Sequence, residues 1–280
     1  MPIALGYESH INISDVNYII EGDSPDIPES LPKDADPEDR RIAEYIVSEI
    51  RNGSVLQLGI GAVPNSIGKM LAESDIRDLG GHSEVLVDAF MNLYYAGKLT
   101  NNKTRDKGLS VYTAAVGSKA LYDFIDDNPI CCCAPVDYVN NVHTISEIDN
   151  FISINSCIGL DLFGQVCSES AGYRQVSGTG GQLDFVQGAF ASKNGKSFMC
   201  THSTRRDSNG KLHSLIHPVL PAGSIVTTPR AAVNYVVTEF GAVNLKGKST
   251  WQRAEMLISI AHPDFREDLI PEAEKLGIWQ

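Results

Sequence analysis

The segment that most constrains the fold is a strand, a glycine turn and a helix in direct succession over residues 54–73. An apolar strand at 54–58 leads into the turn Gly-Ile-Gly-Ala-Val-Pro at 59–64, and a helix is predicted from 65 to about 73. This strand–turn–helix unit is the repeating element of doubly wound sheets. It predicts an α/β fold with a mostly parallel sheet and helices on both faces.

Apolar runs and helical periodicity elsewhere in the chain repeat this alternation. Asp36-Pro37 followed by acidic residues starts a helix that stops at Asn52-Gly53. Further buried strands are predicted at residues 84–88, 109–115, 151–154 and 197–200. Further helices are predicted at residues 118–126, 183–191, 250–259 and 263–276.

The first 35 residues differ in character from the rest of the chain. Residues 11–21 predict a strand, and residues 22–37 are rich in proline and acids, as linkers are. A lone strand ahead of a linker has no partner of its own. We therefore expect residues 1–35 to be the last strand of a domain lying before residue 1, plus a linker, and residues 36–280 to form the catalytic domain.

The charge balance limits the possible ligands. With 23 basic and 35 acidic residues the formal charge is −12, which disfavours binding to nucleic acid. An anionic ligand would have to be held locally, by backbone N–H groups and helix N-termini. The sequence contains neither a signal-peptide pattern nor a run long enough to span a bilayer, so we expect a cytoplasmic protein with no membrane contact.

Three of the six cysteines are consecutive, at Cys131, Cys132 and Cys133. Neighbouring residues of a strand point to opposite faces, so this run cannot form a metal cage alone, and no CxxC pair supplies further ligands. Small buried apolar side chains in a reducing cytosol are the favoured interpretation, and no metal site is predicted. A zinc or redox role is the alternative.

The glycine turn is suited to an anionic ligand. Gly59 and Gly61 allow a tight turn and close approach of a ligand to the backbone, and the next helix begins there. Pro64 stands where a dinucleotide fingerprint has its third glycine, and no ribose-binding acid follows at the expected distance. A nicotinamide-dependent dehydrogenase is therefore disfavoured, and a purely structural turn remains open.

Glu84 is the candidate nucleophile. It stands in Gly-Gly-His-Ser-Glu-Val-Leu-Val-Asp at 80–88, at the mouth of a predicted apolar strand, where α/β proteins place reactive groups. Partial burial there would strip water from a carboxylate and strengthen it as a nucleophile. The alternative is a solvated Glu at a strand edge. His82 fits a hydrogen-bonded neighbour better than a base.

A second glycine-rich segment, Ser-Gly-Thr-Gly-Gly-Gln-Leu-Asp-Phe, occupies residues 177–185. Glycines that lead into a helix present several N–H groups in one direction, which suits an oxyanion or a thioester carbonyl. A simple loop is the alternative.

Together these segments carry a family resemblance. GIGAVPN at 59–65, LGGHSEVLVDA at 79–89 and VSGTGGQLDF at 176–185 resemble the acetyl-CoA hydrolase/transferase family, most closely its 4-hydroxybutyrate and butyryl-CoA:acetate CoA-transferases. The resemblance continues through DLFGQVCSES at 161–170, LPAGSIVTTPR at 220–230, YVVTEFG at 235–241 and AHPDFR at 261–266.

The resemblance implies a CoA-transferase fold and a ping-pong exchange of CoA between a short-chain acyl-CoA and acetate. Glu84 would form an acyl anhydride and then a glutamyl-CoA thioester, and Asn140 could offer its amide to the acyl carbonyl. Coenzyme A would be a substrate, with no tightly bound cofactor, and the protein a homodimer. The implied CoA contacts are Gly59, Ile60, Gly61, Ala62, Val63, Ile158 and Gly181.

Three departures from the family pattern leave alternatives open. Gly159 stands where relatives carry an acid, the triple cysteine is unusually rich in sulfur, and the family's additional N-terminal domain is almost wholly absent. An acyl-CoA hydrolase, with water in place of the acceptor acid, is one alternative. A non-catalytic remnant that at most binds CoA or a partner chain is the other.

Overall fold

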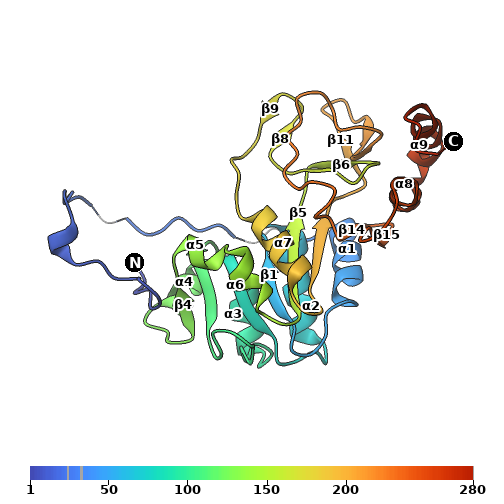
Figure 1. The fold of residues 1–280 in the computed structure, drawn as a ribbon. Helices are drawn as coiled ribbons and strands as arrows, with labels where there is room; N and C mark the ends of the chain where they lie inside the picture. Colours follow the sequence, from blue (N-terminus) through green and yellow to red (C-terminus); the bar gives the residue numbers. More distant parts are fainter. Residues whose placement is uncertain (24, 32–33, 280) are drawn as a thin grey trace.

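The fold was analysed in a computed structural model, which describes residues 1–23, 25–31 and 34–279. Its centre is an eight-stranded sheet with the order β15-β14-β10-β5-β1-β2-β3-β4 (Figure 1). All neighbouring strands are parallel except β14 and β15, which are antiparallel. The strands are β1 (Val55–Leu58), β2 (Gly80–Leu86), β3 (Ser110–Ala115), β4 (Cys131–Cys133), β5 (Phe151–Ser156), β10 (Lys196–Cys200), β14 (Tyr235–Thr238) and β15 (Gly241–Asn244).

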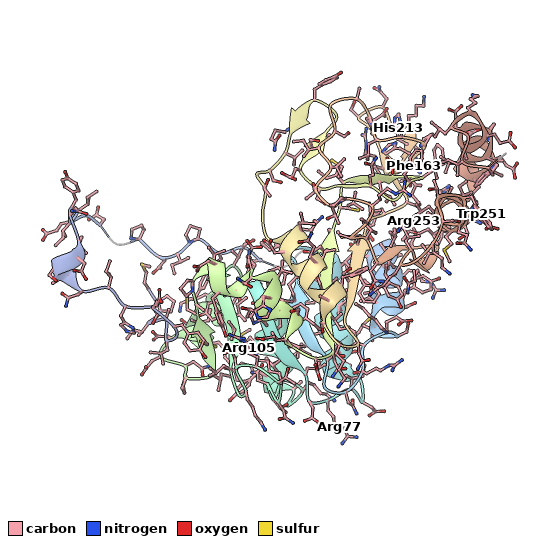
Figure 2. The ribbon with its side chains drawn as sticks, in the orientation of Figure 1. Arg77, Arg105, Phe163, His213, Trp251 and Arg253 are labelled. Carbon is pink, nitrogen blue, oxygen red and sulfur yellow. The ribbon has the colours of Figure 1, made fainter. Side chains whose placement is uncertain are left out.

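Helices cover both faces of the sheet, as the sequence predicts. The first face packs against α1 (Pro37–Val47), α2 (Ala62–Glu73), α3 (Asp88–Tyr95) and α4 (Lys119–Ile125). The second face packs against α5 (Val136–Val139), α6 (Val142–Ser146) and α7 (Gln182–Ala191). Side chains fill the space between these layers (Figure 2). The sheet is therefore buried on both sides, which explains why its strands read as continuous apolar runs.

A second, smaller core lies beyond the carboxyl ends of β5 and β10. Short strands form three small sheets there, and the chain ends in two helices, α8 (Thr250–Ser259) and α9 (Pro263–Lys275) (Figure 1). Arg253 of α8 is buried and donates to the backbone carbonyls of Arg230 and Lys248 (Figure 2). The short strands are β6 (Gly159–Asp161), β7 (Val166–Cys167), β8 (Ser170–Ala171), β9 (Arg174–Gln175), β11 (Thr204–Arg206), β12 (Leu212–Ser214) and β13 (Ile216–His217).

The helix that follows the glycine turn begins earlier than predicted. α2 starts at Ala62 rather than at 65, so Pro64 lies inside its first turn. Proline is compatible with a first turn because the N–H groups there have no partner within the helix. Gly61 precedes the helix with φ +135°, a backbone conformation that side chains disfavour. A glycine at this position therefore allows the strand to turn directly into the helix.

The strand that carries Glu84 is also displaced from its predicted position. β2 runs from Gly80 to Leu86 rather than over 84–88, and Asp88 opens α3. Gly80 and Gly81, which lie outside the predicted strand, are buried strand residues paired with β1. An added Cβ at Gly81 would lie 3.2 Å from Ser110 Oγ and 3.3 Å from the Phe90 ring, so a glycine there allows α3 to pack closely on β2.

The strand predicted over residues 11–21 is wrong. This stretch contains one short 3₁₀ turn, η1 (Ile13–Asp15), and its apolar side chains, including Ile11, Ile19 and Ile20, are exposed. A strand needs a neighbour to pair its backbone groups, and the described part of the chain supplies none to this segment. The described residues of the predicted linker at 22–37 form no helix or strand before α1 begins at Pro37. Residues 24, 32 and 33 of this linker lie outside the described residues.

The contact between α2 and α3 yields a stability prediction. An added methyl group at Gly68 would lie 2.5 Å from Ala89 Cβ and 3.2 Å from its Cα. In an exposed helix Gly→Ala is favourable by about 1 kcal/mol. Here we expect Gly68→Ala to lower the free energy of unfolding by about 1–3 kcal/mol, because the backbone of α3 blocks the added carbon.

Urea denaturation measures this change. Lys69→Ala, on the exposed side of the same helix turn, is the control and should stay within about 0.5 kcal/mol of the parent. Unchanged or increased stability of Gly68→Ala would show that α2 and α3 are not packed as described.

Candidate active site

Glu84 lies on β2, close to the strand's carboxyl end, with its side chain half-buried. Val55 and Leu56 of β1 pair with Gly80 and Gly81, and the same register continued along the strands places Gly59 level with Glu84. The carboxylate and the glycine turn are therefore neighbours at the carboxyl edge of the sheet. This is the edge at which open α/β sheets bind ligands.

Two groups from the side of the sheet covered by α5 and α7 converge on the Glu84 carboxylate. The backbone N–H of Gly181, just before α7, donates to Glu84 Oε2 at 3.0 Å. An added Cβ at Gly181 would overlap Asn140 Nδ2 and lie 2.6 Å from Glu84 Oε2. The side chain of Asn140, which ends α5, thus borders the same small space. A carboxylate, a backbone N–H and a side-chain amide from three separate elements meet at one point.

Asp184 adds a second carboxylate to this region. It lies in the first turn of α7 and is half-buried. Burial, and then the negative charge of Glu84, raise the pKa of Asp184 above its usual range. The site therefore concentrates acidic groups, while its hydrogen-bond donors come from backbone and amide groups.

The glycine turn lies at the point where the strand order reverses. From β1 the chain proceeds to β2, β3 and β4 on one side, whereas from β5 it proceeds to β10 and β14 on the other. Such a reversal opens a crevice at the carboxyl ends of the two central strands. Gly59, Ile60 and Gly61 line a cavity of about 240 Å³ beside Asp88.

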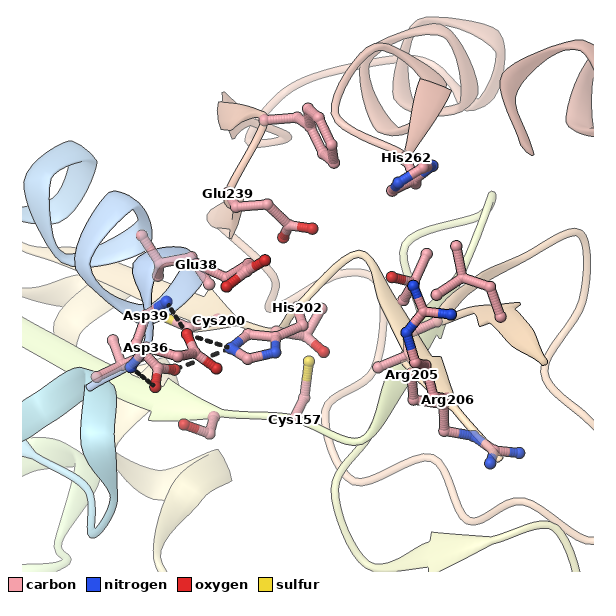
Figure 3. A pocket seen from close by; sticks show the side chains of 18 residues that line it. Asp36, Glu38, Asp39, Cys157, Cys200, His202, Arg205, Arg206, Glu239 and His262 are labelled. Carbon is pink, nitrogen blue, oxygen red and sulfur yellow. Dashed lines mark hydrogen bonds and ion pairs between the residues drawn. The ribbon is translucent and has the colours of Figure 1, made fainter. Parts of the chain in front are cut away.

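A larger cavity, of about 670 Å³, opens on the other side of the turn (Figure 3). Val63 lines it together with Cys157, which precedes Ile158, while Arg205 and Arg206 come from β11. Glu84 is not among the residues that line either cavity. The candidate nucleophile Glu84 therefore lies outside both cavities at this edge of the sheet.

The side chains of Asp36, Asp39 and His202 converge in the larger cavity (Figure 3). Both carboxylates already act as caps of α1, since each accepts a hydrogen bond from the backbone N–H of the other residue. His202 Nε2 lies 2.8 Å from Asp39 Oδ1. The three side chains are therefore explained by the capping of α1 and by the hydrogen bond that links α1 to His202, just after β10. The positive end of the helix dipole at the N-terminus of α1 also disfavours a metal cation there.

The C-terminal domain model of the acetyl-CoA hydrolase/transferase family matches residues 117–273. The chain belongs to this family. Over its full length it is 52% identical to a butyryl-CoA:acetate CoA-transferase of Anaerostipes caccae, and over 98% of its length it is 47% identical to a 4-hydroxybutyrate coenzyme A transferase of Clostridium kluyveri. It covers only 64% and 63% of those two relatives.

Solved structures agree with this membership of the acetyl-CoA hydrolase/transferase family. RipA from Yersinia pestis superposes with a TM-score of 0.91 at 42% identity, covering 100% of this chain and 62% of that one. A 4-hydroxybutyrate CoA-transferase from Porphyromonas gingivalis superposes with a TM-score of 0.81 at 39% identity, covering 97% and 63%. The predicted CoA-transferase fold is therefore confirmed.

The structure brings some of the site residues predicted from the sequence together and separates others. Glu84, Gly181 and Asn140 meet directly. The predicted CoA contacts of the glycine turn divide between two cavities, and Ala62 and Ile158 are absent from the residues lining either. At Gly159 a side chain would lie 3.1 Å from the carbonyl of Leu215 and 3.2 Å from the His217 ring, so this strand is packed against β13.

Sequence reasoning missed Asp184 and His202. Asp184 could have been found, because it stands three residues after Gly181 and shares the edge of the helix that faces Glu84. No local pattern announces His202, since its partner Asp39 is 163 positions away.

The His202–Asp39 pair gives stability a pH dependence. Burial alone would lower the pKa of His202, but the hydrogen bond to Asp39 and the charges of Asp39 and Asp36 outweigh it and raise the pKa above 6.5. A raised pKa means that the stabilisation is present below the unfolded-state pKa and is lost as pH rises through the folded-state value. His202→Gln should therefore cost more free energy of unfolding at pH 5.5 than at pH 8.5.

We expect the difference between the two pH values to stay below about 1 kcal/mol, because the pair is partly exposed to solvent. Denaturant titrations at both pH values measure it, with the exposed His10→Gln as the control. An equal loss at pH 5.5 and 8.5 would contradict a charged pair in the folded state.

Proposed function

We propose that this chain carries the catalytic glutamate of an acyl-CoA:carboxylate CoA-transferase that exchanges CoA between short-chain acyl groups, such as butyryl or 4-hydroxybutyryl, and acetate. The observation that carries the proposal is the convergence of the Glu84 carboxylate, the Gly181 N–H and the Asn140 amide at the ligand-binding edge of the sheet. Residues 36–280 would form the catalytic domain. Because the chain spans under two thirds of its relatives, the remainder of a complete enzyme would contribute to the acyl pocket.

The first step uses the free oxygen of the carboxylate. With Oε2 held by the Gly181 N–H, Oε1 of Glu84 attacks the thioester carbonyl, and the carbon–sulfur bond breaks. Coenzyme A leaves as a thiolate, and an acyl-glutamyl anhydride remains. The Asn140 amide borders this point and would stabilise the oxyanion that develops on the acyl carbonyl.

The second step places negative charge on Oε2 itself. The thiolate attacks the side-chain carbonyl carbon of Glu84, and the anhydride bond to the first acid breaks, which releases that acid as a carboxylate. During the attack Oε2 becomes an oxyanion, already bonded to the Gly181 N–H. A glutamyl-CoA thioester results. An acceptor carboxylate then reverses both steps, and the full cycle requires no net proton transfer.

Coenzyme A would act as a substrate, with no tightly bound cofactor. The formal charge of −12 leaves its phosphates to be held by local donors at the glycine turn. We propose the contacts Gly59, Ile60, Gly61, Ala62, Val63, Ile158 and Gly181. The turn's place beside Glu84, at the reversal of strand order, supports the members of this set that lie in the turn.

An acyl-CoA hydrolase is the second candidate. Acetyl-CoA hydrolases, such as that of Candida albicans, are more distant relatives at 28% identity. Glu84 serves either chemistry, so the products decide. A transferase consumes butyryl-CoA only when acetate is present and forms acetyl-CoA, whereas a hydrolase releases free CoA without acetate. Identity of 52% to a transferase favours the first outcome.

We further propose a cytoplasmic homodimer. The six cysteines are free thiols, as a reducing compartment favours, and several are deeply buried. Within the described residues, no helix combines the length and apolar character needed to cross a membrane.

Replacing the nucleophile tests the assignment. Glu84→Gln keeps an oxygen for the Gly181 N–H but removes the nucleophilic carboxylate, so acetyl-CoA formation from butyryl-CoA and acetate should fall at least about a thousandfold. Glu73→Gln, the same substitution on the exposed end of α2, is the control and should retain activity. Exchange that persists in Glu84→Gln would overturn the proposed role.

The oxyanion donor permits a second test. Gly181→Ala adds a carbon that overlaps the Asn140 amide and crowds Glu84, so turnover should fall about a hundredfold or more. At Gly178, in the same loop, an added carbon meets no atom within 4 Å. Gly178→Ala should therefore change turnover much less, and equal losses in the two variants would remove the special role of Gly181.

A further inference from the structure

His82 is a fully buried, polar side chain that the proposed reaction does not use. It stands two residues before Glu84 on β2, and both side chains point to the face covered by α5 and α7. Its Nε2 lies 2.8 Å from the backbone carbonyl of Val139. A fully buried histidine whose hydrogen bond crosses to another element costs desolvation, so it requires an explanation.

The proton position on the ring follows from its partners. A backbone carbonyl only accepts hydrogen bonds, so Nε2 carries a proton and donates it to Val139. Nδ1 is buried and finds no partner in the described chain, which suits a bare lone pair rather than a second N–H. Burial, and then the charge of Lys103, lower the pKa of His82 to about 4, so the ring is neutral. A neutral ring with one fixed tautomer is a poor proton shuttle but a rigid hydrogen-bond donor.

The hydrogen bond ends next to a residue of the candidate site. Val139 is the last residue of α5, and Asn140 follows it with its amide beside Gly181 and Glu84. α5 has only four residues, and the backbone N–H of Asn140 bonds to the Val136 carbonyl at 2.8 Å, so the conformation of this one turn sets where the Asn140 side chain lies. Asn140 Oδ1 is also buried without a partner in the part of the chain that the structure describes. The carbonyl of Val139 is therefore a direct means of setting the position of Asn140.

The same ring also contacts the helix that carries the other donor. Its edge-to-face partners are Phe151 of β5 and Phe185 of α7, with ring centroids at 6.0 and 6.3 Å. Phe185 N–H donates to the carbonyl of Gly181 in the first turn of α7. His82 shares β2 with Glu84 and thus contacts both α5, which Asn140 ends, and α7, which Gly181 precedes.

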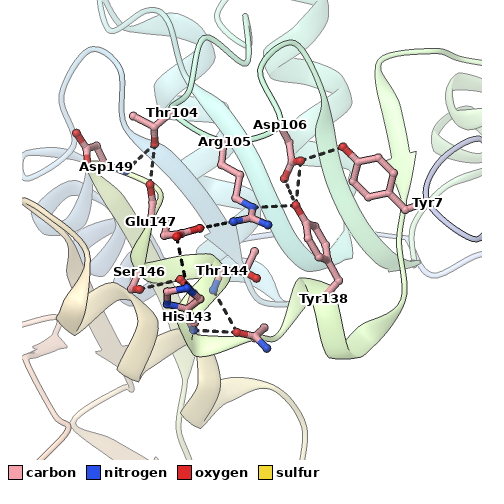
Figure 4. Close-up of polar contacts among 11 residues, drawn as sticks. Tyr7, Thr104, Arg105, Asp106, Tyr138, His143, Thr144, Ser146, Glu147 and Asp149 are labelled. Carbon is pink, nitrogen blue, oxygen red and sulfur yellow. Dashed lines mark hydrogen bonds and ion pairs between the residues drawn. The ribbon is translucent and has the colours of Figure 1, made fainter.

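A surface network holds the outer side of α5 in place (Figure 4). Tyr138 O–H donates to the carboxylate of Asp106, and Arg105 Nε donates to the Tyr138 oxygen at 3.0 Å. Tyr7 donates to the same carboxylate at 2.9 Å. These contacts fix the residue before Val139 from outside, so the bond from His82 is the matching inner anchor of α5.

We propose that His82 is a positioning residue whose Nε2–H, through the Val139 carbonyl, holds the Asn140 amide in register with Glu84 and Gly181. The inference rests on the proposed function, since Asn140 acts there as an oxyanion donor. The role of His82 is to fix geometry rather than to transfer protons. Its effect can be large, since displacing a catalytic group by about 1 Å can cost about a hundredfold in rate.

Three variants of this chain separate the hydrogen bond from packing. His82→Phe keeps an aromatic ring beside Phe151 and Phe185 but removes the donor. His82→Gln restores an N–H close to the position of Nε2. Phe151→Leu is the matched control, because it loosens the same aromatic contact and leaves the Val139 bond in place.

Two readouts are needed. The first is the single-turnover release of butyrate from butyryl-CoA, which reports the first half-reaction. The second is the side-chain ¹⁵N–¹H amide signal pair of Asn140, assigned by its loss in Asn140→Ala. In His82→Phe the release rate should fall by about a hundredfold at unchanged half-saturating butyryl-CoA, and the Asn140 pair should move towards solvent-averaged positions. His82→Gln should have most of the parent release rate and the parent Asn140 signals. Phe151→Leu should likewise keep most of the parent rate and the parent signals.

An unmoved Asn140 pair in His82→Phe overturns the inference, as does His82→Gln behaving like His82→Phe. Equal losses in Phe151→Leu also overturn it, since packing alone would then explain the effect. If the parent chain releases no butyrate, the proposed function fails for this chain. The amide signals then decide the role of His82 by themselves.

Discussion

The hydrogen bond from the Gly181 backbone N–H to Glu84 Oε2 is the contact on which the candidate site depends. It joins β2 to the residue just before α7, since Gly181 lies 97 positions after Glu84 in the chain. A side chain at residue 181 would displace the Asn140 amide and the Glu84 carboxylate, because its Cβ would occupy their space. It also leaves the other oxygen of Glu84 available, which a nucleophilic role demands.

The rest of the fold brings these groups to one edge. Parallel pairing of β1, β2 and β5 places the glycine turn, Glu84 and the end of β5 together, and the glycines at the start of β2 let α3 pack closely beneath it. On the opposite face α5 and α7 supply donors without a local excess of basic side chains. On a protein with a formal charge of −12, the proposed anionic substrate would be held locally by such backbone and amide dipoles.

Much of this could be read from the sequence because it rests on local rules. The strand, glycine turn and helix at 54–73 predicted a parallel sheet, and the helix at Thr250–Ser259 was predicted with its observed bounds. Local rules failed where tertiary packing decides: Gly80 and Gly81 belong to a strand because they pair with β1, and their lack of side chains lets α3 pack closely. The strand predicted at 11–21 failed because apolar alternation does not supply a pairing partner. His202–Asp39 and His82–Val139 were out of reach, because each joins residues far apart in the chain.

The most direct test of the central claim is to locate the covalent intermediate. The chain would be incubated with butyryl-CoA, its intact mass recorded, and the intermediate reduced with borohydride before peptide mapping. The account predicts a CoA adduct and, after reduction, an alcohol at the side chain of Glu84. Adduct or reduction at any other residue, or a folded sample that forms neither, would contradict the assignment of Glu84 as the nucleophile of this chain.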